Sequence, residues 1–370
     1  MISKNQIKKI LKKYDKSDIH IGVLGGHSAL DIATGAKILG FKTVVVVRKD
    51  RQKTYTKYYR NLFDEIILVK DFNEINDKVI VKKLQELNTL FVHNRYFWVY
   101  CDYKKVEDDF LVPILGTRDM VKLEERDVAK NQYYLLQKAN IRMPKIFKDK
   151  KDIDRLVIVK VAEAIRSYER AFFFCNDFNS YKTNSKKLLK MGLITKEDLD
   201  KAVIEEYIIG AQTNFNYFYS PITKELELMG MDTRRQTNLD GLLRLPADIQ
   251  LEALKYIKPK IIETGHITVT TKESIIESAF DIGEKFVNVC KQEHPIGIIG
   301  AFALQGSVVS LKGREELVIF DVSMRIPGSP GTMFTPLTAY KYLEPISYGK
   351  RISMEVKDAI EKNKLDLICT

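Results

Sequence analysis

LVIFDVSMRIPGS, residues 317–329, reads as an apolar strand that carries Asp321, Ser323 and Arg325 at a spacing of two residues. Successive side chains of a β-strand point to opposite faces, so these three share one face. The residues between them are apolar and pack, which turns the polar face toward a cleft or solvent. Such a face suits a divalent cation that bridges phosphates, with the guanidinium taking the remaining phosphoryl charge. The alternative is an edge strand with a cross-strand ion pair.

The composition is that of a globular chain with two or three lobes. The chain has 370 residues, of which 45% are hydrophobic and 10% aromatic, which excludes a disordered or collagenous protein. Its four cysteines are scattered, so they indicate neither a zinc site nor a disulfide framework, and a reducing cytoplasm is the expected location. No run of about 18 apolar residues occurs, and we therefore expect no membrane span.

The net charge is +11, which is compatible with nucleic acid, with small anionic ligands or with a lysine-rich surface. The lysines are spread along the chain and mixed with acidic residues, so no single basic stripe emerges. A pocket for phosphorylated metabolites uses this charge better, because electropositive clefts raise the local concentration of anions. We therefore expect no nucleic-acid partner.

The chain begins with a unit typical of an open parallel sheet. A strand over 19–24 is followed by the turn GGHS at 25–28, a helix and a second strand over 41–47. Backbone N–H groups at the start of such a helix favour anions, and His27 and Ser28 add side-chain donors. The alternative for Ser28 is a simple helix cap.

Two further strands are expected at 65–69 and 89–92. His93 and Tyr96 follow the second of them, at the carboxyl end of a strand, where open α/β sheets bind their ligands. Taken alone, His93 is more often structural than a ligand contact.

Three features then follow in order. Lys160 lies in a strand over 156–161, EEYIIG at 205–210 reads as a hinge, and the acid-polar-arginine strand comes last. A helix that contains DVAK, residues 127–130, precedes them. The ordered set resembles the ATP-grasp ligases.

That resemblance implies an α/β chain, α+β overall, with the ATP-grasp fold. We expect an N-terminal open parallel-sheet domain over 1–122. The small ATP-grasp lobe, with a nucleotide-covering loop and the hinge, is expected over 123–210, and the lobe with the metal site over 211–370.

Within this superfamily the chain is similar to the archaeal PurP family, and the similarity runs nearly end to end. That family makes the formylated ribonucleotide FAICAR from the aminoimidazole carboxamide ribonucleotide AICAR, formate and ATP. The similar segments are GGHSALDI (25–32), FLVPILGTR (110–118), LVIVK (156–160), AVIEEYIIG (202–210), YFYSP (217–221), LMGMD (228–232), NLDGLLRLPA (238–247) and AFALQ (301–305).

The resemblance also implies roles for individual residues. Gln305 and Asp321 would hold Mg²⁺, or Mn²⁺ in its place, and Arg325 would act in catalysis on the γ-phosphate of the co-substrate ATP. We further expect a cytoplasmic homo-oligomer with AICAR, formate and ATP as its ligands. The residues expected to bind ATP are Lys160, Glu205, Glu206, Ile208 and Gln236, and those expected to bind AICAR are His27, Ser28, Tyr96 and His266.

The chain departs from the family at the expected site. Residues 161–171 read VAEAIRSYERA, without the glycines that let backbone amides approach the ATP phosphates, and Arg166 and Arg170 are candidates to replace them. Asp321 is shorter than the family's glutamate, and His266 stands where the family has asparagine. The alternative function is therefore a relative that binds nucleotide without formylating AICAR, or that ligates a different pair of substrates.

Overall fold

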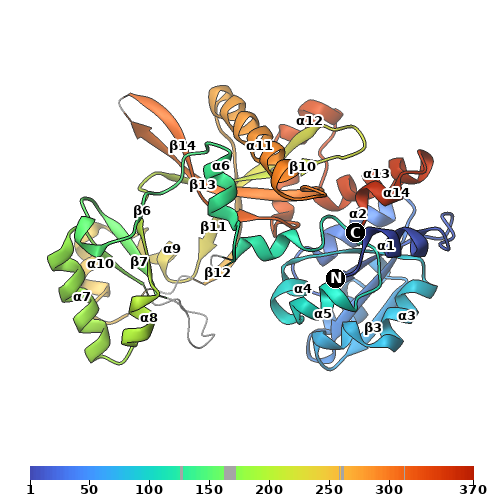
Figure 1. Ribbon diagram of the computed structural model, residues 1–370, viewed down its shortest axis with the longest axis horizontal. Coiled ribbons are helices and arrows are strands. Elements are labelled where there is room, and N and C mark those ends of the chain that lie inside the picture. Colours follow the sequence, from blue (N-terminus) through green and yellow to red (C-terminus); the bar gives the residue numbers. More distant parts are fainter. Residues whose placement is uncertain (126–127, 162–171, 258, 260–261, 312) are drawn as a thin grey trace.

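The computed structural model describes the whole chain except residues 126–127, 162–171, 258, 260–261 and 312. Within the described residues, the strands form three separate sheets. Figure 1 shows the N-terminal sheet and the small green sheet at opposite ends of the long axis, with the third sheet between them. No helix among the described residues is long and apolar enough to cross a membrane.

The N-terminal sheet is parallel, with the strand order β3-β2-β1-β4-β5, as the strand–turn–helix–strand unit predicts. Its strands are β1 (His20–Leu24), β2 (Lys42–Arg48), β3 (Glu65–Val69), β4 (Thr89–Val92) and β5 (Ile114–Leu115). The central strands β1 and β4 are buried on both faces, as in parallel sheets that helices cover on both sides. The helices of this region are α1 (Lys4–Leu11), α2 (Ala29–Ile38), α3 (Lys78–Glu86), α4 (Arg95–Tyr100) and α5 (Tyr103–Asp108). Short 3₁₀ or π turns lie at Lys49–Arg51, Thr54–Tyr58, Arg60–Leu62, Phe72–Asn76 and Met120–Glu124.

The C-terminal end of the chain packs on this first sheet. Helix α13 (Tyr348–Glu361) crosses α2 at Gly35 and Gly349, where an added Cβ would lie 1.9 Å from the opposite backbone. Only glycine allows so close a crossing. After α14 (Leu365–Ile368), Thr370 exchanges two backbone hydrogen bonds with Ile114 of β5, each 2.9 Å long. The predicted domain boundaries, after residues 122 and 210, stay predictions.

The small sheet is antiparallel, with the order β6-β9-β7-β8, and its inner face packs on two helices. The DVAK helix expected ahead of it is not formed at residues 128–130, which make a turn, and residues 126–127 lie outside the described residues. The helix begins instead after Asn131, whose side chain accepts hydrogen bonds from two backbone N–H groups. The elements are α6 (Gln132–Lys138), β6 (Ile146–Phe147), a 3₁₀ turn (Lys150–Asp152), β7 (Val157–Lys160), β8 (Phe172–Cys175), α7 (Phe178–Lys190), α8 (Lys196–Asp200) and β9 (Val203–Glu206).

The third sheet is antiparallel, with the order β12-β11-β10-β13-β14, and its strand β14 contains residues 317–323 with Asp321 and Ser323. The long helix α11 (Glu273–Glu293) packs on it through Phe286 and other buried apolar residues. Its strands are β10 (Ala211–Tyr219), β11 (Leu226–Gln236), β12 (Glu263–Val269), β13 (Gly300–Leu311) and β14 (Arg314–Ser323). The remaining helices are α9 (Leu239–Leu242), α10 (Ala247–Ala253), a 3₁₀ turn (Pro330–Phe334) and α12 (Leu337–Tyr342).

A buried ion pair joins the third sheet to α13. The guanidinium of Arg351 donates to both carboxylate oxygens of Glu227 at 2.9–3.1 Å, and Tyr342 Oη donates to the same carboxylate at 2.7 Å. The two charged side chains are only 4–5% exposed. Since a buried charge that loses its partner costs several kcal/mol, this pair fixes α13, and with it α2, against the sheet.

We expect Glu227→Gln to lower the free energy of unfolding by about 3 kcal/mol, measured by urea titration. Glu225→Gln is the matched control, because Glu225 pairs with Lys341 at 2.8 Å but is 60% exposed, and we expect less than about 1 kcal/mol there. Burial raises the pKa of Glu227, but Arg351 outweighs burial and lowers it below 4.5. This contribution is therefore complete above the unfolded pKa and is lost as the pH falls through the lower folded value. Equal losses in the two variants would contradict the assignment.

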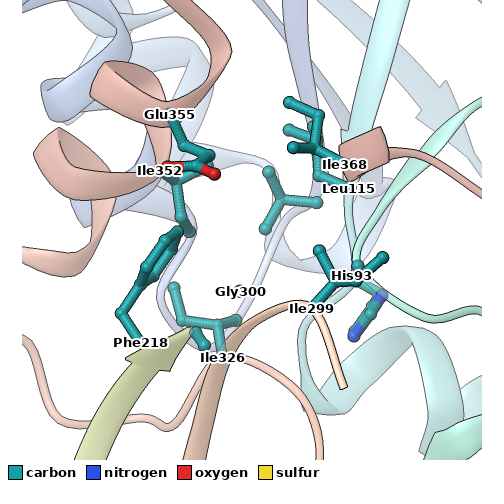
Figure 2. A pocket seen from close by; sticks show the side chains of 12 residues that line it. His93, Leu115, Phe218, Ile299, Gly300, Ile326, Ile352, Glu355 and Ile368 are labelled. Atoms are coloured by element: carbon teal, nitrogen blue, oxygen red, sulfur yellow. The ribbon is translucent and has the colours of Figure 1, made fainter. Parts of the chain in front are cut away.

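A small cavity lies at the junction of the N-terminal sheet, the third sheet and α13. It measures about 30 Å³, which is room for a water molecule, and isoleucine side chains dominate its lining (Figure 2). His93 stands at its margin, and burial lowers the pKa of this imidazole to about 3, so it is neutral. Among the described residues, Nδ1 of His93 has no hydrogen-bond partner. These features fit the structural alternative for His93.

Candidate active site

Two adjoining polar cavities lie where the N-terminal sheet meets the third sheet, and Arg95, Ser323 and Arg325 line both. The outer cavity measures about 710 Å³, which is in the range of small-molecule sites. The inner cavity measures about 30 Å³ and admits only an ion, a water molecule or the end of a ligand. The outer cavity is further lined by Glu124 and Asp321, and the inner one by His27, Arg234, Glu263, His266 and Gln305.

The three polar residues predicted to share a face, Asp321, Ser323 and Arg325, all line the cavities. The predicted strand is wrong beyond Ser323, where β14 ends, and Arg325 reaches the cavities from the bend that follows. Gln305 of β13 pairs directly with Asp321 of β14, next to a bulge in the strand register. Side chains at directly opposed positions of antiparallel strands share a face. The amide group of Gln305 donates to Ser323 Oγ at 2.9 Å, and its oxygen accepts from Arg234. The hairpin thus brings the two expected metal ligands together, although Arg234 holds the oxygen of Gln305 in this structure.

Arg325 is buried, with 6% of its surface exposed, and faces the carboxylate of Glu124 at 3.9 Å. Burial lowers the pKa of Arg325, and Glu124 opposes that change. Burial also raises the pKa of Glu124 to about 7, against the opposing effect of Arg325. Arg325 thus faces a buried carboxyl group whose pKa is raised toward neutrality by burial.

Glu124 is a residue that the sequence analysis missed. It lies in the 3₁₀ turn Met120–Glu124, and its Oε1 accepts the backbone N–H of Met324 at 2.5 Å. No local pattern marks it, because its partners are 200 residues further along the chain. The nearby sequence holds a second glutamate, Glu125, and nothing in the sequence distinguishes the two.

The glycine turn before α2 is held from two sides. Ser28 adopts φ 67° and makes no side-chain cap, so the cap alternative is wrong; its hydroxyl donates to the carbonyl of Pro327 at 3.0 Å. Asn94 donates to the carbonyls of Leu24 and His27 at 2.9 and 2.7 Å. The turn is therefore fixed to the loop that follows Arg325.

His27 lines the inner cavity, and its ring lies so close to Gly328 that an added Cβ there would be 1.3 Å from Cε1. Burial, with help from the charge of Arg325, lowers the pKa of His27 to about 4. The imidazole is therefore neutral at pH 7. Among the described residues, its buried Nδ1 has no hydrogen-bond partner.

His266 lies between two carboxylates. Its Nδ1 is 2.5 Å from Oδ2 of the fully buried Asp232, and its Nε2 is 2.9 Å from Oε1 of Glu263. Burial disfavours the charged imidazole, but the two carboxylates outweigh burial and raise the pKa of His266 to about 9. Its side chain lines the inner cavity beside His27.

Tyr96 does not line either of the two cavities as described. Its ring packs on Gly26, where an added Cβ would lie 2.1 Å from Cδ2, and its hydroxyl accepts from Arg51 at 3.1 Å. The neighbouring Arg95 lines both cavities instead. Tyr96 thus supports the turn, and Arg95 is the residue of α4 that lines both cavities.

Of the residues expected to bind ATP, Lys160, Glu205 and Glu206 lie on the small sheet. Lys160 of β7 pairs with Glu205 of β9, which is 2% exposed and also accepts from Tyr133 Oη at 2.8 Å. The backbone N–H of Glu206 donates to the carbonyl of Lys145. Lys160, Glu205 and Glu206 are not among the residues that line the two cavities.

Ile208 follows the end of β9 and belongs to no strand. Gln236 ends β11 on the third sheet, where its backbone N–H donates to Asp240. The structure therefore places four of the five predicted ATP residues on two sheets and Ile208 in the segment after β9. The glycine-free loop, with Arg166 and Arg170, lies outside the described residues.

The donor set at β13 and β14 fits a hard divalent cation. Asp321 supplies a carboxylate, Gln305 an amide and Ser323 a hydroxyl, all oxygen ligands on one face of the hairpin. Magnesium is commonly held by one or two carboxylates, with phosphate and water oxygens completing the shell. Together with Arg95, Arg234 and Arg325, the arrangement suits an anionic ligand that carries phosphates.

Comparisons with known proteins find relatives that match the whole length of this chain. Family models described as domains or proteins of unknown function match residues 21–147 (DUF1246) and 180–370 (DUF1297). The 5-formaminoimidazole-4-carboxamide-1-(beta)-D-ribofuranosyl 5'-monophosphate synthetase of Methanocaldococcus jannaschii is 38% identical over 372 residues, covering 100% of this chain and 99% of the relative. The synthetase of the same name from Methanopyrus kandleri is 35% identical over 371 residues, covering 100% of both chains.

Solved structures share the fold. The IMP biosynthesis protein PurP of Thermococcus kodakaraensis superposes with a TM-score of 0.70 at 23% identity, covering 95% of this chain and 100% of that one. Phosphoribosylglycinamide synthetase of Anaerococcus prevotii gives 0.55 at 16% identity, covering 92% and 76%. These likenesses confirm the predicted ATP-grasp fold. The chain belongs to the family of 5-formaminoimidazole-4-carboxamide-1-(beta)-D-ribofuranosyl 5'-monophosphate synthetases.

Proposed function

We propose that the chain is an ATP-dependent ligase that formylates AICAR to FAICAR with formate, in purine biosynthesis. The names of its full-length relatives support the reaction. The observation that carries the proposal to this chain is the joint placement of Asp321 and Arg325 on one cavity, beside Arg95. Carboxylate and guanidinium groups in this arrangement suit phosphoryl transfer, which depends on positioning and on neutralising charge.

The proposed reaction needs no protein nucleophile. An oxygen of formate attacks the γ-phosphorus of ATP, the bond to the bridging oxygen breaks, and ADP leaves with formyl phosphate formed. The AICAR amine then attacks the formyl carbon, inorganic phosphate leaves, and the nitrogen loses one proton. Arg325 would stabilise the negative charge on the phosphoryl oxygens in both steps, since it lines both cavities.

The cations of the inner cavity suit an anionic group of the ribonucleotide. Arg234 lines it, and His266, with its raised pKa of about 9, is protonated at neutral pH. Neutral His27 adds a ring nitrogen without a partner among the described residues. Because the inner cavity is small, the ligand would place only one end there and the rest in the outer cavity.

Magnesium would be held by Asp321 and Gln305, and when bound with ATP it would neutralise part of the phosphate charge. Arg234 would then release the oxygen of Gln305. Adenine would pair with the backbone of Glu206 and Ile208, and Lys160 would reach the phosphates. We also propose a cytoplasmic location and a homo-oligomer.

The test is mass spectrometry of the products from ATP, Mg²⁺, formate and AICAR, with formate omitted in the control. We expect FAICAR and ADP in equal amounts, and neither in the control. Absence of FAICAR while the same sample binds AICAR or ATP would overturn the proposal in favour of the relative that binds nucleotide without formylation.

Lys160 provides a test of the ATP site. We expect Lys160→Met to lower kcat/KM for ATP by about 10- to 100-fold, because a charge-assisted contact to phosphate is lost. Lys186→Met is the matched control, since Lys186 is exposed on α7, and it should leave kcat/KM unchanged. Lys160 pairs with Glu205, so thermal unfolding of both variants is measured as well. A kcat/KM for ATP equal to that of the parent would remove Lys160 from the site.

A further inference from the structure

The inner cavity holds a second group of metal-binding side chains, separate from Gln305 and Asp321. A ring nitrogen of His27, a carboxylate oxygen of Glu263 and a ring nitrogen of His266 all lie within 4.8 Å of one another. Around a zinc ion the donor atoms stand about 3.4 Å apart, given bonds of about 2.1 Å. Nε2 of His266 and Oε1 of Glu263 are already 2.9 Å apart. Small side-chain movements therefore close the three donors around one ion.

The side chains around the group orient it as metal ligands are oriented. Asp232 lies 2.5 Å from Nδ1 of His266, which leaves Nε2 facing Glu263 and the cavity. Metal-binding histidines usually donate their other N–H to a carboxylate in this way. Asp232 is itself fixed by Asn214 and Asn216, whose amides donate to it at 2.9 and 2.6 Å.

His27 supplies an independent observation. Its Nδ1 is buried and has no hydrogen-bond partner among the described residues, although buried polar atoms are nearly always paired. The ring is confined by Gly328, so it stays at the cavity. The cavity volume of about 30 Å³ suits an ion with one further small ligand.

The donor chemistry selects the class of cation. Two imidazoles and one carboxylate suit zinc, cobalt or nickel, whereas magnesium prefers oxygen ligands alone. Arg234 lies 3.2 Å from the second oxygen of Glu263, and Arg95 and Arg325 also line the cavity, so these three side chains oppose a cation. The carboxylates of Asp232 and Glu263 supply the opposing attraction, and the ion displaces the proton between Nε2 of His266 and Oε1 of Glu263. With three protein ligands, the ion keeps a position open toward the cavity for an anionic oxygen.

We propose that His27, Glu263 and His266 form a binding site for one divalent transition-metal cation of the zinc class. The inference goes beyond the proposed function and does not rest on it, because the site is tested with the metal alone.

The test is titration of the metal-free, full-length chain with Co²⁺, followed by visible absorption spectroscopy and, with Zn²⁺, by calorimetry. No ATP or AICAR is present. We expect one ion per chain, visible bands of four- or five-coordinate Co²⁺, and no displacement by a hundredfold excess of Mg²⁺. His266→Asn should weaken binding at least 100-fold, and Asp232→Asn about 10- to 100-fold.

His294→Asn is the matched control, because His294 does not line the cavity and its Nε2 lies 3.1 Å from Oδ2 of Asp119. This variant should bind Co²⁺ as the parent does. Glu263→Gln is a second ligand variant, on a more exposed strand, for use if His266→Asn does not fold. No saturable binding, binding that survives Glu263→Gln and His27→Asn, or the intense near-ultraviolet bands of cobalt–thiolate bonds would each overturn the proposal. The last result would place the ion on the cysteines.

Discussion

Replacing Arg325 with lysine is expected to lower kcat for FAICAR formation by about 10²- to 10³-fold, the cost of removing one preorganised donor to developing charge. Arg325 faces both cavities from a buried position, so its planar guanidinium is held in one orientation. Lysine keeps the charge opposite Glu124 but loses the forked geometry that binds phosphoryl oxygens. Steady-state kinetics with saturating ATP, formate and AICAR measures the effect.

Arg314→Lys is the control for this variant. Arg314 begins the same strand, β14, but is exposed at the far end of the hairpin. We expect the control to retain the kcat of the parent. A loss of less than about threefold in Arg325→Lys would exclude Arg325 from the transition-state contacts, since that change corresponds to well under 1 kcal/mol.

The second large effect is expected at Asp321. Asp321→Asn removes the carboxylate proposed to hold magnesium, and we expect kcat to fall about 100-fold and the Mg²⁺ concentration for half-maximal rate to rise at least tenfold. Asparagine keeps the size of the side chain, so the pairing of Gln305 with residue 321 stays in place. The measurement is the initial rate as a function of Mg²⁺ at fixed ATP.

Glu315→Gln is the matched change from acid to amide on the same strand. Glu315 is exposed and pairs with Lys272 at 2.6 Å, remote from the cavities. We expect its Mg²⁺ dependence to equal that of the parent. If Asp321→Asn also keeps that dependence, the magnesium ligand lies elsewhere, and Glu124, which lines the same cavity, is the next carboxylate to change.

Much of the fold could be predicted from the sequence, because strand and helix periodicity are local properties. The strands expected at 65–69 and 89–92 are found at those residues, and the parallel first sheet follows from the strand–turn–helix–strand unit. The prediction of a helix over DVAK was wrong at residues 128–130, where the chain forms a turn, and the helix begins after Asn131. A capping side chain set that boundary more strongly than the apolar pattern.

The site was predicted only in part. The alternation determined by itself that Asp321 and Ser323 share a polar face, because a strand has a period of two. Arg325 lies beyond the end of β14, so the tertiary structure decided its place at the same cavities. Which charges meet that face was decided by the tertiary structure. Glu124 reaches Arg325 from 201 residues away, and Asp232 of β11 reaches His266 of β12 across the pairing of the two strands. Their pKa values depend on burial and on distances of a few ångströms between distant segments, and sequence spacing carries neither quantity.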